Sequence, residues 1–178
     1  FLKSKTSTIW NGYELNYNKQ KVQEQIYFTK NILIVGRVTN AKNGLNILKA
    51  LNVFYNNHGW SPNIYWVGRI DKFDKNSNDY VLKMIDYLGN NKHLNFKFVG
   101  EVKDIYELFS NYDLLLHVTK YEGLPNVICE AMILGCPVIA SNICDHPKIL
   151  DNNRGILCDP NSPQSISTAL HIITLYFL

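Results

Sequence analysis

Six short apolar runs separated by helical patterns constrain the fold of this chain more than any other feature. The runs are NILIVGRV (31–38), NIYWVG (63–68), FKFVG (96–100), LLLHVT (114–119), PVIAS (137–141) and GILCD (155–159). Each is apolar on both alternating faces, as is typical of a strand covered on both sides. Parallel strands need crossover connections, and the intervening helices supply them. The sequence therefore predicts an α/β fold, a doubly wound and mostly parallel six-stranded sheet with helices on both faces.

Helical patterns lie between these runs, and another follows the last run. The clearest follows the first run, where apolar residues recur at helical spacing. The last segment, ISTALHIITLYFL, is shorter than the roughly 20 residues that span a bilayer, so we predict a core or docking helix. One stripe of that helix is expected to be buried against the sheet. The apolar residues beside the stripe are expected to dock on another domain of the full-length protein. The stripe after the first apolar run is Gly44, Ile47, Leu48, Leu51, Phe54 and Tyr55. The stripe in the last segment is Ile166, Leu170, Ile173 and Phe177, with Ile172, Leu175 and Tyr176 beside it.

Composition narrows the class of protein without naming a ligand. The 178 residues carry a net charge of +3 from dispersed lysines, which argues against a nucleic-acid surface or a polybasic membrane arm. The four cysteines form no C-x-x-C pair and are expected to be reduced thiols in a cytoplasmic protein. Residues 1–30 are polar and lack an initiator Met or a signal peptide, so they are interpreted as a linker preceding a domain at 31–178.

Charged residues follow the first predicted strand in the stretch GRVTNAKNG. Ligands of open α/β sheets bind beyond the carboxyl ends of the strands, so this turn is a candidate site. Arg37 and Lys42 suit a diphosphate at a helix N-terminus, with Gly36 allowing the backbone to bend. An ordinary surface pair of cations is the alternative. The stretch lacks the G-x-G-x-x-G and Walker patterns, which disfavours ordinary dinucleotide and P-loop chemistry.

The second candidate site lies in YEGLPNVICEAMILGCPVIAS, where a helix is expected to begin near Pro125. Its apolar residues predict a helix buried nearly all round, with Ile128, Ala131, Met132 and Gly135 facing the sheet. Glu130 is the exception, because no basic residue stands three or four positions away to pair with it. Its partners are expected to be either donors within the protein or two vicinal hydroxyls of a ribose.

These residues resemble a known family. The stretch from Glu122 to Glu130 is similar to the E-x7-E motif of retaining glycosyltransferases of the GT-B fold, family 4, and AMILGCPVIAS resembles its continuation. GRVTNAKNG resembles the G-R-x4-K-G motif of that family, and FKFVGEV, GILCDPNSPQSISTAL and TIWNGYE resemble further parts of it. The resemblance implies a Rossmann-like, C-terminal, nucleotide-sugar-binding half of a two-domain enzyme, whose N-terminal acceptor domain is absent from this chain.

Roles for individual residues are also implied by the resemblance. Arg37 and Lys42 correspond to residues that bind the donor diphosphate, Glu122 to the carboxylate at the transferred sugar, and Glu130 to the ribose ligand. Glu122 is assigned to orienting the sugar, with a covalent nucleophile as the alternative. The backbone that lines sugar and phosphate corresponds to Gly36, Gly123, Leu124, Pro125, Asn126 and Val127, and turns that lie against the base correspond to Gly68, Arg69, Glu101 and Val102.

The implied reaction is transfer of a sugar, with retention, from a UDP- or GDP-sugar to a hydroxyl acceptor, without a metal or a cofactor. Polysaccharide, capsule or glycolipid assembly at the cytoplasmic face of the inner membrane is implied, with peripheral membrane association of the full-length protein. A nucleotide-sugar epimerase, a phosphorylase and a nucleotide-binding module without catalysis are the alternatives; the isolated chain is expected to bind nucleotide without turnover.

Three departures from the family pattern stand out. Asn43 separates Lys42 from Gly44, Lys148 replaces a frequent Glu, and Thr119 replaces a frequent Ser while keeping its hydroxyl. The presence of Lys148 is expected to bear on specificity for sugar or acceptor.

Overall fold

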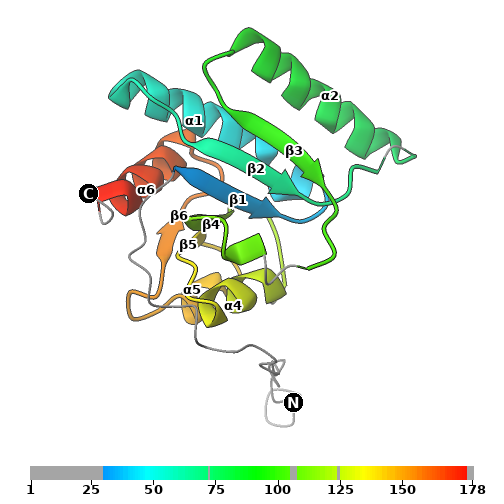
Figure 1. The fold of residues 1–178 in the computed structure, drawn as a ribbon. Coiled ribbons are helices and arrows are strands. Elements are labelled where there is room, and N and C mark those ends of the chain that lie inside the picture. Colours follow the sequence, from blue (N-terminus) through cyan, green and yellow to red (C-terminus); the bar gives the residue numbers. More distant parts are fainter. Residues whose placement is uncertain (1–29, 72, 105–107, 124, 176–178) are drawn as a thin grey trace, which may run out of the picture.

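The computed structural model of the chain describes residues 30–71, 73–104, 108–123 and 125–175. These residues form one six-stranded sheet in the order β3-β2-β1-β4-β5-β6, in which every neighbouring pair is parallel (Figure 1). The predicted doubly wound α/β fold is therefore confirmed. The strands are β1 (Asn31–Val35), β2 (Asn63–Val67), β3 (Phe96–Gly100), β4 (Leu114–His117), β5 (Val138–Ser141) and β6 (Ile156–Cys158).

Helices cover both faces of the sheet, and alternate residues of β1 enter separate cores. Ile32 and Ile34 pack in a cluster with residues of α1, α2 and α6, whereas Leu33 packs with residues of α4 and α5. Figure 1 shows the same arrangement, with α1 and α6 on one side of the sheet and α4 and α5 on the other. The helices are α1 (Gly44–His58), α2 (Lys75–Asn90), α4 (Asn126–Ile133), α5 (His146–Ile149) and α6 (Pro163–Leu175), with a 3-10 turn η2 (Asn40–Lys42) before α1.

The third strand departs from the expectation that every strand is covered on both faces. β3 lies at the edge of the sheet, and Lys97 and Val99 on its outer face are exposed. An edge strand has a neighbour on one side only, and its solvent-facing side chains need no apolar cover. The apolar letters of FKFVG indicated a strand correctly but did not indicate its place in the sheet.

The α1 stripe is buried as predicted, apart from the half-buried Tyr55. In α6, Ile166, Leu170 and Ile173 are buried, and this helix packs against α1 and β6. Ile172 and Leu175 lie off the stripe and are 38% and 57% exposed. Tyr176 and Phe177 lie outside the described residues, as does the predicted linker up to residue 29. None of the described helices is both long and apolar enough to cross a membrane.

α4 contradicts the prediction of a helix buried nearly all round. Ile128 and Ala131 are its buried residues, whereas Ile133 is exposed. The helix packs mainly on β4 and β5, which cover one face. Gly135 does not face the sheet either, because it follows the helix end with a φ of 73°. In the left-handed region a glycine ends a helix at low cost, which explains its place there.

Candidate functional site

A pocket of about 520 Å³ lies beyond the carboxyl ends of β1 and β4, which are neighbours in the sheet. In open parallel sheets this rim is where ligands bind. Four of the residues singled out from the sequence line the pocket together, although they come from two distant segments. The pocket is lined by Arg37, Thr39, Ala41 and Lys42 after β1, and by Tyr121, Glu122 and Gly123 after β4.

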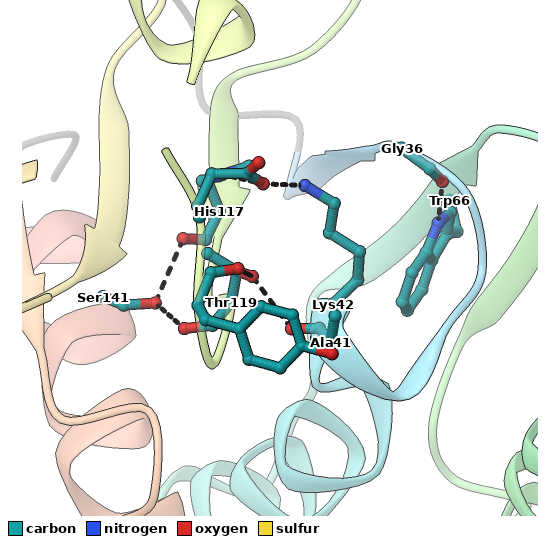
Figure 2. Close-up of polar contacts among 9 residues, drawn as sticks. Gly36, Ala41, Lys42, Trp66, His117, Thr119 and Ser141 are labelled. Carbon is teal, nitrogen blue, oxygen red and sulfur yellow. Dashed lines mark hydrogen bonds and ion pairs between the residues drawn. The ribbon is translucent and has the colours of Figure 1, made fainter. Parts of the chain in front are cut away.

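Hydrogen bonds fix the loop after β4 onto the turn η2, as Figure 2 shows for Thr119 and Ala41. The hydroxyl of Thr119 lies 2.8 Å from the carbonyl oxygen of Ala41, and the amide of Lys120 donates to the same oxygen at 2.8 Å. From the next strand, the hydroxyl of Ser141 donates to the carbonyl of Thr119 at 2.6 Å. Because Thr119 and Ser141 are buried, these bonds are protected from water and hold the two walls of the pocket together.

The residue inserted between Lys42 and Gly44 is accommodated by a left-handed turn. Asn43 has a φ of 62°, a conformation that asparagine tolerates better than most residues. Its side chain is 1% exposed and donates to the carbonyl of Pro160 at 2.6 Å. Gly44 then starts α1 against the side chains of Met84 and Trp66, where a Cβ would lie 2.5 and 2.8 Å from their atoms. Lys42 therefore enters the pocket while Gly44 stays on the buried stripe.

Two glycines allow the ends of β1 and β2 to approach each other. Gly36 and Gly68 have φ values of 134° and 149°, and a Cβ on Gly68 would overlap the carbonyl of Gly36. That carbonyl accepts a 2.7 Å hydrogen bond from the indole of Trp66 (Figure 2). A Cβ on Gly36 would lie 2.9 Å from Cε of Lys42. Gly36 thus leaves room for the Lys42 side chain beside the pocket.

The two cations of the pocket differ in whether they are paired with a carboxylate. Lys42 and Glu122 form an ion pair, and their side chains are 21% and 29% exposed. Arg37 is exposed, and among the described residues its side chain forms no ion pair. A partly buried carboxylate is thus neutralised within the protein, while one guanidinium at the mouth of the pocket is open to an anion.

Two buried histidines beside the pocket were missed by sequence reasoning. His117 ends β4, and its Nε2 lies 3.7 Å from Oε2 of Glu122. His146, on α5, holds its ring 5.5 Å from that of His117 and shares a 2.9 Å hydrogen bond between Nδ1 and the carbonyl of Ser141. Neither Nε2 has a hydrogen-bond partner among the described residues. The sequence signal that could have indicated His117 is a polar residue at the end of an apolar run, in LLLH.

Burial lowers the pKa of both rings. For His117 the pKa lies well below its usual 6.5, because of burial and then the charges of Lys42 and His146. For His146 burial is again the largest cause, opposed by the carbonyl of Ser141 and by Glu122. Both imidazoles are therefore neutral at neutral pH.

The start of α4 lies directly after the pocket wall. Pro125 is the N-cap residue rather than the first helical residue, and it makes no side-chain capping hydrogen bond. Pro125 is buried, Asn126 exposed and Val127 half-buried, whereas Leu124 lies outside the described residues. Glu130 is half-buried one turn further on, and burial raises its pKa. Among the described residues, the carboxylate singled out from the sequence has no hydrogen-bond or ion-pair partner.

The remaining candidates stand apart from the pocket lining. Arg69 is exposed after β2 and forms a 3.5 Å ion pair with Asp71, and Glu101 and Val102 are exposed after the edge strand β3. Lys148 is exposed on α5 and pairs with Asp145 at 2.8 Å. Among the described residues, no group of three or more His, Cys, Asp or Glu side chains is arranged to hold a metal ion.

Comparison with known proteins gives a family match. The family model described as "Glycosyl transferases group 1" matches residues 17–174. Spore coat protein SA of Bacillus subtilis is 27% identical over 189 aligned positions, which cover 95% of this chain and 49% of that protein. O-antigen chain mannosyltransferase B of Escherichia coli is 32% identical over 79 positions, covering 43% of this chain and 20% of that protein.

Solved structures share the fold. A glycosyltransferase of Rickettsia africae superposes with a TM-score of 0.70 at 20% identity, covering 88% of this chain and 40% of that one. The Anabaena protein HepE, solved in complex with UDP and glucose, also gives 0.70, at 23% identity, covering 81% of this chain and 38% of that one. The chain therefore spans less than half the length of each of these proteins.

Proposed function

Because the chain belongs to the glycosyl transferases group 1 family, we propose that it is the donor-binding domain of a glycosyltransferase. The donor is a nucleoside diphosphate sugar, UDP- or GDP-linked, and the sugar passes with retention to a hydroxyl acceptor. Residues 31–178 form this domain, and residues 1–30 link it to an acceptor domain. One observation carries the proposal: Arg37, Lys42 and Glu122 meet in one pocket at the carboxyl ends of β1 and β4.

The cations suit the diphosphate of the donor. Arg37 has no ion-pair partner among the described residues and offers a planar set of donors that matches phosphate oxygens. Lys42 adds a second positive charge in the same pocket. As the bond from sugar to phosphate breaks, negative charge develops on the leaving diphosphate, and these two side chains stabilise it. The positive end of the α4 helix dipole adds to that effect.

The carboxylates suit hydroxyl groups. Glu122 lines the pocket and orients the transferred sugar by accepting hydrogen bonds from its hydroxyls. Glu130, half-buried and unpaired among the described residues, binds the hydroxyls of the ribose. The backbone from Gly123 to Val127 borders sugar and phosphate, and the turns at Gly68, Arg69, Glu101 and Val102 lie against the base.

The whole protein is proposed to act in polysaccharide, capsule or glycolipid synthesis at the cytoplasmic face of the membrane. The name of one relative, an O-antigen chain mannosyltransferase, supports a role in polysaccharide synthesis. UDP in the HepE complex supports a nucleotide donor. Because the chain spans less than half of these proteins, we expect it to bind the donor without turning it over.

Isothermal titration with UDP, GDP and ADP tests the proposal. We expect the chain to bind one of these diphosphates in preference to the others, and to bind it more tightly than the corresponding monophosphate. Arg37→Gln should weaken that binding about tenfold, because one charged contact to phosphate is lost. Lys49→Gln, on the exposed side of α1, is the matched control. Failure of all three diphosphates to bind would refute the proposal.

A further inference from the structure

His117 is placed where a residue of the apolar core is expected. It occupies the last position of β4, all of whose residues are buried, and its side chain is 2% exposed. Burying an imidazole nitrogen without a hydrogen bond is unfavourable, and Nε2 has none with any described residue. Oε2 of Glu122 lies 3.7 Å from Nε2, slightly too far for a hydrogen bond. The ring is therefore directed at the pocket wall without yet being bonded to it.

In the proposed function, Glu122 and the donor diphosphate compete for the ammonium group of Lys42. In the structure its ammonium pairs with Glu122 (Figure 2 shows the direction of the Lys42 side chain). A bound diphosphate attracts the same ammonium more strongly, because it carries more charge than one carboxylate. When Lys42 turns to the phosphate, Glu122 loses the partner that neutralises it in a partly buried position. A partly buried carboxylate that has lost its cation needs another hydrogen-bond donor to keep its orientation.

We propose that His117 is a positioning residue for donor binding, which donates a hydrogen bond from Nε2 to Glu122 once Lys42 engages the diphosphate. This inference rests on the proposed function of the pocket. A contraction of less than 1 Å brings Nε2 and Oε2 from 3.7 Å to ordinary hydrogen-bond distance. His117 then holds one carboxylate oxygen, so that the other faces the hydroxyls of the sugar. It acts on the sugar through Glu122 alone.

The protonation states around His117 fit this role. A neutral imidazole carries one proton, and in the Nε2–H tautomer that proton points at Glu122. His146, whose ring is the neighbour on α5, donates from Nδ1 to the carbonyl of Ser141, which leaves its own Nε2 as an acceptor. Lys42 is the cation that faces the same space. A neutral imidazole can donate a hydrogen bond to the Glu122 carboxylate without placing a second positive charge beside Lys42 in a buried position.

An isosteric pair of variants separates hydrogen bonding from packing. His117→Gln keeps an N–H donor near the position of Nε2, whereas His117→Met has a similar length and no donor. Each variant is titrated with UDP and UDP-glucose, and with GDP and GDP-mannose. We expect His117→Met to weaken binding of the nucleotide sugar about tenfold, and His117→Gln to stay within about threefold of the unmodified chain. A free diphosphate also draws Lys42 away from Glu122, so His117→Met should weaken its binding in the same direction, whereas His117→Gln should not.

The outcomes distinguish this inference from the function on which it rests. Equal binding of nucleotide sugar by His117→Met and the unmodified chain would overturn the role of His117 and leave donor binding intact. An equal loss in both variants would show that the ring acts by packing and would likewise overturn it. Failure of the unmodified chain to bind any of the four compounds would refute the proposed function itself.

A ligand-free measurement keeps the inference testable if a His117 variant fails to fold. In the Lys42→Met chain, Glu122 has lost its lysine, and nitrogen-15 NMR of the histidine rings reports the tautomer of His117 directly. We expect a proton on Nε2 whose resonance is shifted by a hydrogen bond, and Glu122→Gln should reduce that shift. A proton on Nδ1 in the Lys42→Met chain would overturn the inference, because Nε2 would have nothing to donate.

Discussion

The backbone of Gly68 packs so closely against the carbonyl of Gly36 that a side chain at position 68 has no room. A Cβ there would overlap the carbonyl oxygen of Gly36 and lie 3.2 Å from the amide nitrogen of Arg37. Both glycines also adopt positive φ values, which other residues rarely adopt. The first motif of the pocket is therefore shaped in part by a glycine on the neighbouring strand.

Gly68→Ala is accordingly expected to destabilise the protein by about 2–4 kcal/mol, because both the overlap and the unfavourable φ must be relieved. The midpoint of urea unfolding measures the change. Gly89→Ala is the matched control: Gly89 lies within α2, and nothing approaches the position of its Cβ within 4 Å. The control should be neutral or stabilising by up to about 1 kcal/mol. Similar midpoints for both variants would contradict the close packing at Gly68.

The hydroxyl of Thr119 is expected to matter more than its methyl group. Thr119→Val keeps the shape but removes the hydroxyl, whose oxygen lies 2.8 Å from the carbonyl oxygen of Ala41 and 3.0 Å from that of Tyr121 and whose one proton can be donated to either. We expect a loss of about 1–3 kcal/mol in stability and weaker nucleotide binding, because the two pocket walls are less well held. Thr119→Ser should bind nucleotide as the unmodified chain does. Calorimetric titration of both variants with nucleotide measures the effect. Equal affinities for Thr119→Val and Thr119→Ser would show that the hydroxyl does not contribute to nucleotide binding.

The two carboxylates are expected to respond to different parts of the donor. Glu130→Gln should weaken free nucleotide about tenfold, because a charged acceptor for the ribose hydroxyls is lost. Glu122→Gln should leave free nucleotide nearly unaffected and weaken the nucleotide sugar. Titrations with a diphosphate and with its sugar conjugate separate these effects.

The exposed carboxylate of Asp86 on α2 provides the control for this pair, as Asp86→Asn. If Glu130→Gln binds both ligands as Asp86→Asn does, then Glu130 is a structural carboxylate without a ligand. If Glu122→Gln weakens the free diphosphate as strongly as the sugar conjugate, its assignment to the sugar is wrong.

Acid is expected to destabilise the fold through the two buried histidines. Burial lowers the pKa of His117 and of His146, with Lys42 adding to the effect at both rings and Glu122 and Asp145 opposing it at His146. The unfolded chain binds protons near pH 6.5, where the folded chain does not. Stability therefore falls as the pH drops below about 6.5, by up to about 1.4 kcal/mol per pH unit for each histidine.

Urea unfolding at pH 7.5, 6.5 and 5.5 measures this dependence. His117→Met and His146→Leu should each show a shallower loss, since one buried group no longer takes up a proton on unfolding. His146→Leu should also be less stable at pH 7.5, because the carbonyl of Ser141 loses one of its two donors and keeps only the amide of Ile143. A slope unchanged in both variants would show that other groups cause the acid sensitivity.

The elements with the strongest local signals were predicted correctly. Strands β1, β2, β4, β5 and β6 follow from continuous apolar runs, and the buried stripe of α1 follows from its helical spacing. The burial of α4 was not predicted correctly, because the composition of a helix does not say how many neighbours will cover it. α4 has two strands beside it, so its outer apolar residues lie at the surface.

The sequence by itself determined the α/β class, the parallel strands and the motif residues at their carboxyl ends, because hydrophobic period and turn chemistry are local properties. Only the tertiary structure decided which of those residues meet. Lys42 and Glu122 pair across 80 positions because β1 and β4 are neighbours in the sheet, and strand order has no local signature. His117 likewise ends an unremarkable apolar run, and only the fold places its unbonded nitrogen beside Glu122.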